Sequence, residues 1–297
     1  MLKAFEKKES GLLTSIDFKR RKVRVGYYLM LAFIIFVSIV CLFPPLWIFM
    51  SSFKDVKEFL QSPPTFWPRS FHPEKLPEVW QTLNFGKYYW NTVKMALGEL
   101  VFCILSNGIA GYVISRLKPK GSALFFTIIL WTMMLPSSIS MVPLFMTFMD
   151  FPYLHVDLLN SYIPMWLMAG ANAFYVLLFK NFFDTIPMSY VEAARIDGCS
   201  DVGIFARIIL PLSKPILMVV TIFSINGSWE SFFWPYLVIR EKQLDTVAVQ
   251  LFKMKNAGYT MDKYMIVLLF SIIPPAAVFL VFQKYIMQGI TMSGVKG

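Results

Sequence analysis

Four long stretches of this chain contain no charged residue, and each is long enough to cross a lipid bilayer. They cover residues 25–53, 121–149, 158–179 and 264–283. A helix needs roughly 20 apolar residues to span the hydrocarbon core of a membrane. Only 15% of all residues are charged and 57% are hydrophobic, whereas a soluble domain usually carries about a quarter charged residues. The pattern therefore predicts an all-α integral membrane protein.

Six helical spans account for the whole pattern, at about residues 25–50, 88–114, 122–148, 159–181, 214–238 and 264–286. This prediction divides the chain into an N-terminal segment at 1–24, a six-span transmembrane domain at 25–287 and a tail at 288–297. The longest connection between spans, 51–87, is rich in proline. It is expected to be irregular, with a short helix near residues 77–83.

Basic residues in the short loops predict the orientation, because such loops are retained on the cytoplasmic side of a membrane. Residues 1–24 carry eight Lys or Arg, residues 115–121 carry three, and residues 149–158 carry none. Both termini and the loop 184–213 are therefore expected to be cytoplasmic. The loop 239–263 carries five Lys or Arg and conflicts with this orientation, but an even number of spans and the stronger N-terminal signal favour an external position.

Several classes of function are disfavoured by the sequence. The net charge of +10 does not indicate nucleic-acid binding, because the basic residues lie at span ends and not in a patch interleaved with aromatic residues. Cys41, Cys103 and Cys199 are far apart and only two histidines are present, so neither a disulfide framework nor a metal site is expected. A phosphate-binding loop and a removable signal peptide are also not expected. The prediction is a chain without catalytic residues, metal or cofactor.

A polar, alanine-rich segment interrupts the apolar pattern at residues 192–198, where the sequence reads Glu-Ala-Ala-Arg-Ile-Asp-Gly. Ser189 is expected to cap a helix there, and Glu192, three residues later, completes a capping box that satisfies two free helix-end amides. Gly198 is suited to a left-handed stop at the end of this helix. Ser200 or Asp201 can cap a second short helix. The pattern predicts a helix-turn-helix lying along the membrane surface.

The spacing of this segment resembles the signature of the membrane-spanning subunits of bacterial ABC importers that work with a binding protein. The signature E-A-A-x3-G-x9-I-x-L-P is matched at every position, by Glu192, Ala193, Ala194, Gly198, Ile208, Leu210 and Pro211. In that family the loop forms a coupling helix that sits in a cleft of the ATP-hydrolysing subunit. The resemblance implies that these residues, together with Asp197, form the ATPase-coupling site, with Glu192 as a polar anchor. An ordinary amphipathic loop helix is the alternative.

The last ten residues are similar to the tail of the maltose-type sugar permeases, and that resemblance covers essentially the whole chain. In that family the tail reaches between the two ATPase subunits, so the resemblance implies ATPase contacts at Gly294, Lys296 and Gly297. A frayed terminus is the alternative. The resemblance also implies a second, homologous permease subunit, two copies of an ATPase that binds ATP and Mg, and an extracellular or periplasmic solute-binding protein. The location that it implies is the bacterial inner membrane.

Polar and aromatic residues of the fifth predicted span are candidates for lining a substrate pathway, since polar groups within a bilayer generally face a cavity or another helix. Asn226 and Glu230 share a helical face, which Trp234 is expected to extend. Aromatic rings beside hydrogen-bonding groups suit a sugar, and the candidate set is Asn226, Trp229, Glu230, Phe233 and Trp234. Interhelical hydrogen bonds or an interfacial aromatic belt explain these residues equally well. Glu99, Asn107 and Asn172 are the polar groups of other spans.

The outer loop contains Asn256, Gly258 and Tyr259, at the place where the maltose-type family has a loop that enters the cleft of the binding protein. The resemblance implies the same contact here by position alone, and a plain external turn is the alternative.

The leading functional hypothesis is a permease subunit of an ATP-driven ABC importer, which forms half of the pathway for a carbohydrate, an oligosaccharide by expectation. An ion-coupled secondary carrier is the second hypothesis. Such carriers commonly show two related halves and buried charges near the midplane. This sequence has no evident internal repeat and few central charges, so the first hypothesis is favoured.

Overall fold

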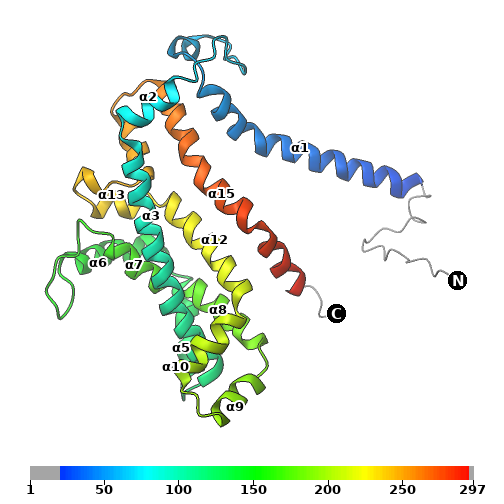
Figure 1. Cartoon of the computed structure of the whole chain (residues 1–297), viewed down its shortest axis with the longest axis vertical. Helices are drawn as coiled ribbons and strands as arrows, with labels where there is room; N and C mark the ends of the chain where they lie inside the picture. The colour runs from blue at the N-terminus through cyan, green and yellow to red at the C-terminus, as the bar shows by residue number, and fades with distance from the viewer. Residues whose placement is uncertain (1–20, 294–297) are drawn as a thin grey trace.

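The chain forms a bundle of long helices from which the first helix diverges (Figure 1), as seen in a computed structural model. The structure describes the backbone of residues 21–293 and the side chains of residues 21–283. Within this part of the chain the helices are joined by short connections, and there is no β-sheet, only an isolated bridge between Phe151 and Val156. The predicted all-α class is confirmed, whereas Gly294, Lys296 and Gly297 of the expected ATPase contact lie outside the described residues.

Three helical segments are long and apolar enough to cross a membrane by themselves. They are α1 (Arg21–Ser51), the continuous run Phe85–Leu117, and Met261–Gln283 within α15 (Met261–Ser293). Three bent pairs of shorter helices reach the same length together, so the described residues contain between three and six candidate spans. The bent pairs are α5 (Ser122–Thr132) with α6 (Ser137–Met149), α7 (Ile163–Gly170) with α8 (Ala173–Thr185), and Asp201–Leu212 with α12 (Lys214–Glu230).

The bends have identifiable causes in the sequence. Pro136 lies between α5 and α6, which meet at 102°, and proline disfavours a helical conformation in the residue before it. Between α7 and α8, which meet at 43°, the Asn172 side chain accepts hydrogen bonds from the amides of Phe174 (3.0 Å) and Tyr175 (3.4 Å) and so caps α8. A helix broken inside a membrane needs partners for the freed backbone groups, and side-chain capping supplies them here.

The run Phe85–Leu117 is the central helix of the bundle. It consists of α3 (Phe85–Phe102), the π-helical segment η3 (Cys103–Asn107), α4 (Gly108–Tyr112) and the π-helical segment η4 (Val113–Leu117). Its first part packs against α7 and α12, and its last part packs against α8. Gly111 allows α4 to approach the backbone of α8 closely, because a Cβ atom at this position would lie only 2.8 Å from Cβ of Phe179 and 3.0 Å from the backbone nitrogen of Lys180.

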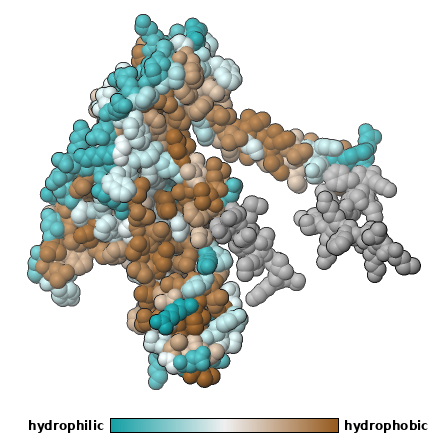
Figure 2. All heavy atoms as spheres, viewed as in Figure 1, coloured by the Kyte–Doolittle hydropathy of each residue, from teal (hydrophilic) through white to brown (hydrophobic). Residues whose placement is uncertain are grey.

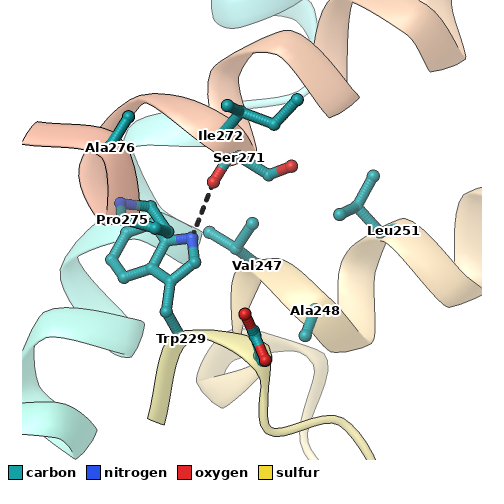
Figure 3. Close-up of a pocket in the computed structure, with 9 residues that line it drawn as sticks. Trp229, Val247, Ala248, Leu251, Ser271, Ile272, Pro275 and Ala276 are labelled. Carbon is teal, nitrogen blue, oxygen red and sulfur yellow. Dashed lines mark hydrogen bonds between the residues drawn. The ribbon is translucent and has the colours of Figure 1, made fainter. Parts of the chain in front are cut away.

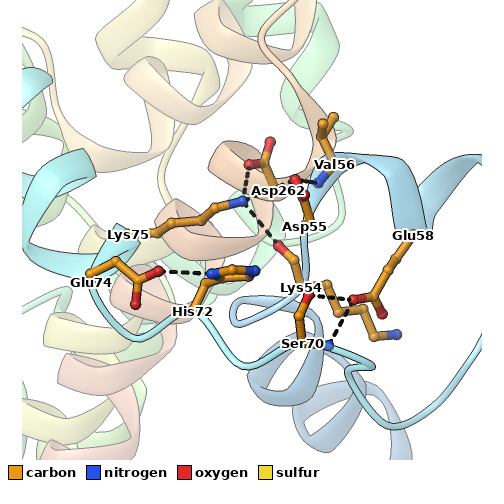
Figure 4. Close-up of polar contacts among 9 residues, drawn as sticks. All are labelled: Lys54, Asp55, Val56, Glu58, Ser70, His72, Glu74, Lys75 and Asp262. Carbon is orange, nitrogen blue, oxygen red and sulfur yellow. Dashed lines mark hydrogen bonds and ion pairs between the residues drawn. The ribbon is translucent and has the colours of Figure 1, made fainter.

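One end of the bundle is closed by the predicted proline-rich connection, which folds around an ion-pair network (Figure 4). It contains η2 (Val56–Leu60) and α2 (Lys75–Thr82), the latter close to the helix expected near 77–83. The ammonium group of Lys75 lies 3.0 Å from Asp262 of α15 and 3.4 Å from Asp55. Burial acts to raise the pKa of Glu58, but hydrogen bonds from the backbone amides of residues 69 and 70 lower that pKa below its ordinary value.

The apolar surface of α1 is almost completely exposed. None of the side chains in its most apolar 18-residue window is buried, and α1 contacts α15 within the described chain. Figure 2 shows this helix as a largely hydrophobic arm that extends away from the bundle. An exposed apolar surface of this length is stable only where lipid or another apolar surface covers it.

Candidate functional site

The loop 184–213 forms two short helical segments that meet at a left-handed glycine. The first is α9 (Ser189–Ile196), and the second consists of α10 (Asp201–Ile204), the π-helical segment η5 (Phe205–Ile209) and α11 (Leu210–Leu212). Gly198 has φ +80°, a conformation that other residues adopt only with strain. The following amide, of Cys199, donates to the carbonyl of Ala194 (2.9 Å). The predicted turn at Gly198 is therefore confirmed.

The start of α9 differs from the prediction. Met188, and not Ser189, precedes the first helical residue, and no side-chain cap is formed, so the predicted capping box of Ser189 and Glu192 is wrong. Pro187 explains the difference, because proline has no amide hydrogen to leave unsatisfied and can open a helical turn. The turn already begins there, with the Tyr190 amide donating to the Pro187 carbonyl (3.4 Å). The cap of the second segment is as predicted, since Ser200 Oγ accepts a hydrogen bond from the Gly203 amide (3.2 Å).

The inner face of the loop is part of the apolar core of the bundle. Its buried side chains are Val191, Ala194, Ile204, Phe205 and Ile209, and they form one cluster with Tyr112, Phe179 and Phe183 of the long helices. Ile208 and Leu210 are half-buried beside this cluster. The loop is therefore held against the bundle by packing and not by its two chain ends alone.

The outer face of the loop carries exposed apolar side chains next to charged ones. Ile196 is 87% exposed and Val202 is 77% exposed. The predicted coupling residues Glu192, Ala193, Asp197 and Pro211 are also exposed. Of the two signature alanines, only Ala193 is available to a partner, because Ala194 packs inward. Arg195 and Asp201 form an ion pair across the turn (3.0 Å) and fix the two segments relative to each other.

The predicted continuous face from Asn226 through Glu230 to Trp234 is not formed. α12 ends at Glu230, and Ser231 is extended (φ −63°, ψ 110°) before α13 (Phe233–Val238) begins. The prediction that Trp234 extends this face is therefore wrong, because a helical face does not continue across an extended residue. Phe233 is exposed, and the side-chain oxygen of Asn226 is buried without a hydrogen-bond partner among the described residues.

Two of the predicted pathway residues line a cavity of about 440 Å³ between α12, α14 (Val247–Asn256) and α15. The indole of Trp229 is buried against this cavity, and its Nε1 donates to the carbonyl of Ser271 (2.9 Å; Figure 3). Glu230 lies at the same cavity and is exposed. The remaining lining is mostly aliphatic, with Val247, Leu251 and Pro275 among its residues.

A second cavity, of about 220 Å³, is lined by several polar groups of the bundle. Glu99 of α3 reaches it and accepts a hydrogen bond from the hydroxyl of Ser228 in α12. Asn172, Tyr175 and Trp234 line it from other elements. The sequence identified Glu99 and Asn172 as polar groups within spans but gave no indication that they converge, and it missed Tyr175. The cavity is thus surrounded by the carboxylate, amide, phenol and indole of these four residues. Such a lining suits a ligand with hydroxyl groups and an apolar face.

Asn107 has a structural role in the bundle. Its side-chain nitrogen donates to the carbonyls of Cys103 (3.0 Å) and Ala169 (2.8 Å), and its side-chain oxygen accepts from the amide of Asn172 (3.0 Å). These contacts satisfy the break between α7 and α8. Asn107 therefore makes interhelical hydrogen bonds, which was the alternative explanation for polar residues within spans. It does not line either cavity.

The outer loop 239–263 is ordered around η6 (Lys242–Leu244) and α14. Asn91 of α3 donates to the carbonyl of Asp245 (2.9 Å), whose buried carboxylate accepts from Lys253 (2.8 Å). The tip follows α14, where Asn256 ends the helix, Gly258 has φ +71° and Tyr259 is 44% exposed. The predicted contact residues thus lie on an exposed tip with a rigid base.

The structure combines long apolar helices, polar groups inside the bundle and a packed loop that exposes apolar side chains among charged ones. This combination is typical of a membrane transport component. The chain belongs to the family described as "Binding-protein-dependent transport system inner membrane component", which matches residues 107–292. This region includes the loop 184–213 and most of both cavities.

Similar proteins cover nearly the whole chain. The probable ABC transporter permease protein YurM of Bacillus subtilis is 30% identical over 95% of this chain and 92% of its own length. The arabinooligosaccharides transport system permease protein AraQ of Halalkalibacterium halodurans is 28% identical over 94% of this chain and 100% of its own length. A chain from the crystal structure of a bacterial ABC transporter that imports the acidic polysaccharide alginate is 26% identical, with a TM-score of 0.79 over 90% of this chain and 98% of that chain.

Proposed function

We propose that this chain is one of two homologous permease subunits of an ABC importer for an oligosaccharide, and that the loop 184–213 docks on the ATPase. The outer face of this loop carries the proposal. Its exposed Ile196 and Val202 lie beside the charged residues Glu192 and Asp197 in a region matched to the family. An isoleucine that is 87% exposed on an otherwise packed loop is typical of a site that a partner covers.

The packing of the inner face supports a mechanical role for the loop. When the ATPase subunits close on ATP, a movement of their surface would carry the loop with it. Because Val191, Phe205 and Ile209 are buried in the core of the bundle, the loop would pass this movement to α8 and to the run Phe85–Leu117 and would not flex independently. Packed interiors resist such independent motion.

The proposed assembly contains this chain, a second permease, two ATPase subunits and an extracellular or periplasmic binding protein. The exposed apolar surface of α1 supports a second permease, which would cover part of that surface, with lipid covering the rest. In this assembly the chain has six spans, and both of its termini are cytoplasmic. The tail 288–297 contacts the ATPase. The tip at Asn256, Gly258 and Tyr259 contacts the binding protein. ATP and Mg are bound by the ATPase subunits.

The charges around the two cavities favour an uncharged oligosaccharide. Glu99 lines the smaller cavity and Glu230 lines the larger, while no lysine or arginine of the described residues lines either. Carboxylates that line a site disfavour an anionic cargo. In this respect the chain would differ from the importer of the acidic polysaccharide alginate.

Replacing Glu99 by glutamine is expected to lower uptake at subsaturating sugar by about tenfold, because a lost or unpaired polar contact in a buried site costs roughly 1–3 kcal/mol. The measurement is the initial rate of radiolabelled sugar uptake into proteoliposomes. The matched control is Glu78→Gln, which makes the same change on the exposed surface of α2, at a residue that lines neither cavity. Equal uptake by wild type and Glu99→Gln would remove Glu99 from the pathway.

Purification of the complex tests the proposed assembly. Co-expression with the neighbouring permease and ATPase genes is expected to give a complex with one copy of each permease and two ATPases, measured by native mass spectrometry. Its uptake is expected to require ATP and the binding protein and to persist when an ionophore collapses ion gradients. Uptake that continues without ATP and stops with the ionophore would instead indicate an ion-coupled carrier.

A further inference from the structure

Arg116 is buried, although it lies at the end of a predicted span, where a basic residue ordinarily sets the orientation of the chain in the membrane. Only 9% of the residue is exposed, whereas the neighbouring basic residues Lys118 and Lys120 are exposed. A basic residue that only fixes orientation can remain in the solvent at the membrane surface. The burial of Arg116 therefore indicates a specific contact.

That contact is with the last turn of α8 and with the first residues of the loop 184–213. One guanidinium nitrogen donates to the carbonyls of Phe183 and Ile186, and another lies 3.7 Å from the sulfur of Met188. The final carbonyls of a helix have no partner within the helix and carry its negative dipole end. Pro187 follows and prevents α8 from continuing. Arg116 thus holds the elbow at which the chain turns from α8 into α9.

The helical turn that carries Arg116 contacts both sides of the loop. Ser115 donates to the carboxylate of Asp184 (2.6 Å), which also pairs with Lys180 of α8 (2.7 Å). The ring of Tyr112 packs on Phe205 of the second loop segment, with 5.1 Å between the ring centroids. The end of the run Phe85–Leu117 is therefore attached to the chain before α9 and to the chain after it.

We propose that Arg116 is a positioning residue that transmits movement of the loop 184–213 to the run Phe85–Leu117. This inference rests on the proposed docking of the loop on an ATPase. The same helix carries Glu99 in the smaller cavity, about 26 Å away at 1.5 Å per residue, so a shift of the elbow reaches the pathway through one continuous helix. Arginine suits this role because its planar guanidinium presents several donors in a fixed geometry, so that one nitrogen serves both carbonyls while another faces the sulfur of Met188.

The test measures how much sugar is transported for each ATP hydrolysed by the reconstituted complex. Arg116→Gln is expected to assemble, because the outer face of the loop is unchanged, and to keep ATP hydrolysis within about threefold. Its transport per ATP is expected to fall about tenfold or more, with partial recovery in Arg116→Lys. The matched control, Lys118→Gln, removes the same charge from an exposed position and is expected to behave as wild type. An unchanged ratio in Arg116→Gln, or an equal loss in the control, overturns the proposal.

A distance measurement in the complex with native Arg116 tests the same proposal independently of how well the variants fold. Spin labels at Leu212→Cys and Leu105→Cys, both exposed positions, report the distance between the loop and the central helix after Cys41 and Cys199 are replaced by serine. The distance is expected to remain constant between the nucleotide-free and ATP-bound states, and a change of several ångströms overturns the rigid connection. Failure of the proposed function would look different, since the wild-type complex would then lack ATP-dependent uptake altogether.

Discussion

Replacing Glu192 by lysine is expected to abolish sugar uptake while leaving the chain folded and inserted in the membrane. Glu192 is exposed on the outer face of the loop, so the change does not disturb the core formed by Val191 and Ala194. Removing one partner of a buried, hydrogen-bonded charge pair at an interface costs about 2–5 kcal/mol, which is about 30- to 4,000-fold in binding. Reversal of the charge is expected to cost at least as much, and uptake should fall by more than about 30-fold.

The matched control for this prediction is Glu78→Lys, which makes the same charge reversal on the exposed surface of α2, at the other end of the bundle. Uptake and the ATPase activity stimulated by the binding protein are measured on the same proteoliposomes. Glu78→Lys is expected to retain both. If Glu192→Lys transported at the wild-type rate, Glu192 would have no role as an anchor to the ATPase.

Replacing Gly111 by leucine is expected to destabilise the packing of α4 against α8. A Cβ atom at Gly111 would lie 2.8 Å from Cβ of Phe179 and 3.0 Å from the backbone nitrogen of Lys180. Because a backbone atom of α8 cannot move aside alone, the two helices must separate. Overpacking of this kind costs about 1–3 kcal/mol or more. The midpoint of thermal unfolding in detergent is expected to fall by several degrees, with less monodisperse protein recovered.

Gly26→Leu provides the control for Gly111, since it makes the same substitution in α1, where nothing lies within 4 Å of the added Cβ atom. It is expected to leave the unfolding midpoint and the yield of monodisperse protein unchanged. Equal unfolding midpoints for Gly111→Leu and wild type would show that α4 and α8 do not pack as closely as described.

The sequence predicted features that depend on residues close together along the chain. Charge-free stretches located the apolar helices, and the turn at Gly198 and the cap at Ser200 were both read correctly. The predicted cap at Ser189 was wrong because the sequence offers two start signals for this helix, Ser189 as a cap and Pro187 as the opening of a helical turn. The helix starts by the second. The face through Trp234 failed because Pro235 cannot donate a helical hydrogen bond to the carbonyl of Ser231, where the helix is broken, and the four-residue spacing of polar groups did not take this proline into account.

The polar contacts between distant segments could not be predicted in this way. Asn107 and Asn172 each looked like pathway residues, yet together they satisfy the break between α7 and α8. Arg116 looked like an exposed orientation signal, although it is buried against α8. The convergence of Glu99, Tyr175 and Trp234 on one cavity depends on how α3, α8 and α13 pack. Such contacts follow from tertiary packing, and single-chain periodicity carries no information about them.

The most direct test of the account asks whether the outer face of the loop 184–213 touches the ATPase. A single cysteine is placed at Ile196, which is 87% exposed, and the assembled, transport-competent complex is treated with a short bifunctional cross-linker. The control is a single cysteine at Leu60, which is 84% exposed and lies beside the ion-pair network at the other end of the bundle. The account predicts a cross-link from Ile196→Cys to the ATPase subunit in at least one nucleotide state and none from Leu60→Cys. The absence of any cross-link from Ile196→Cys in every nucleotide state would contradict it.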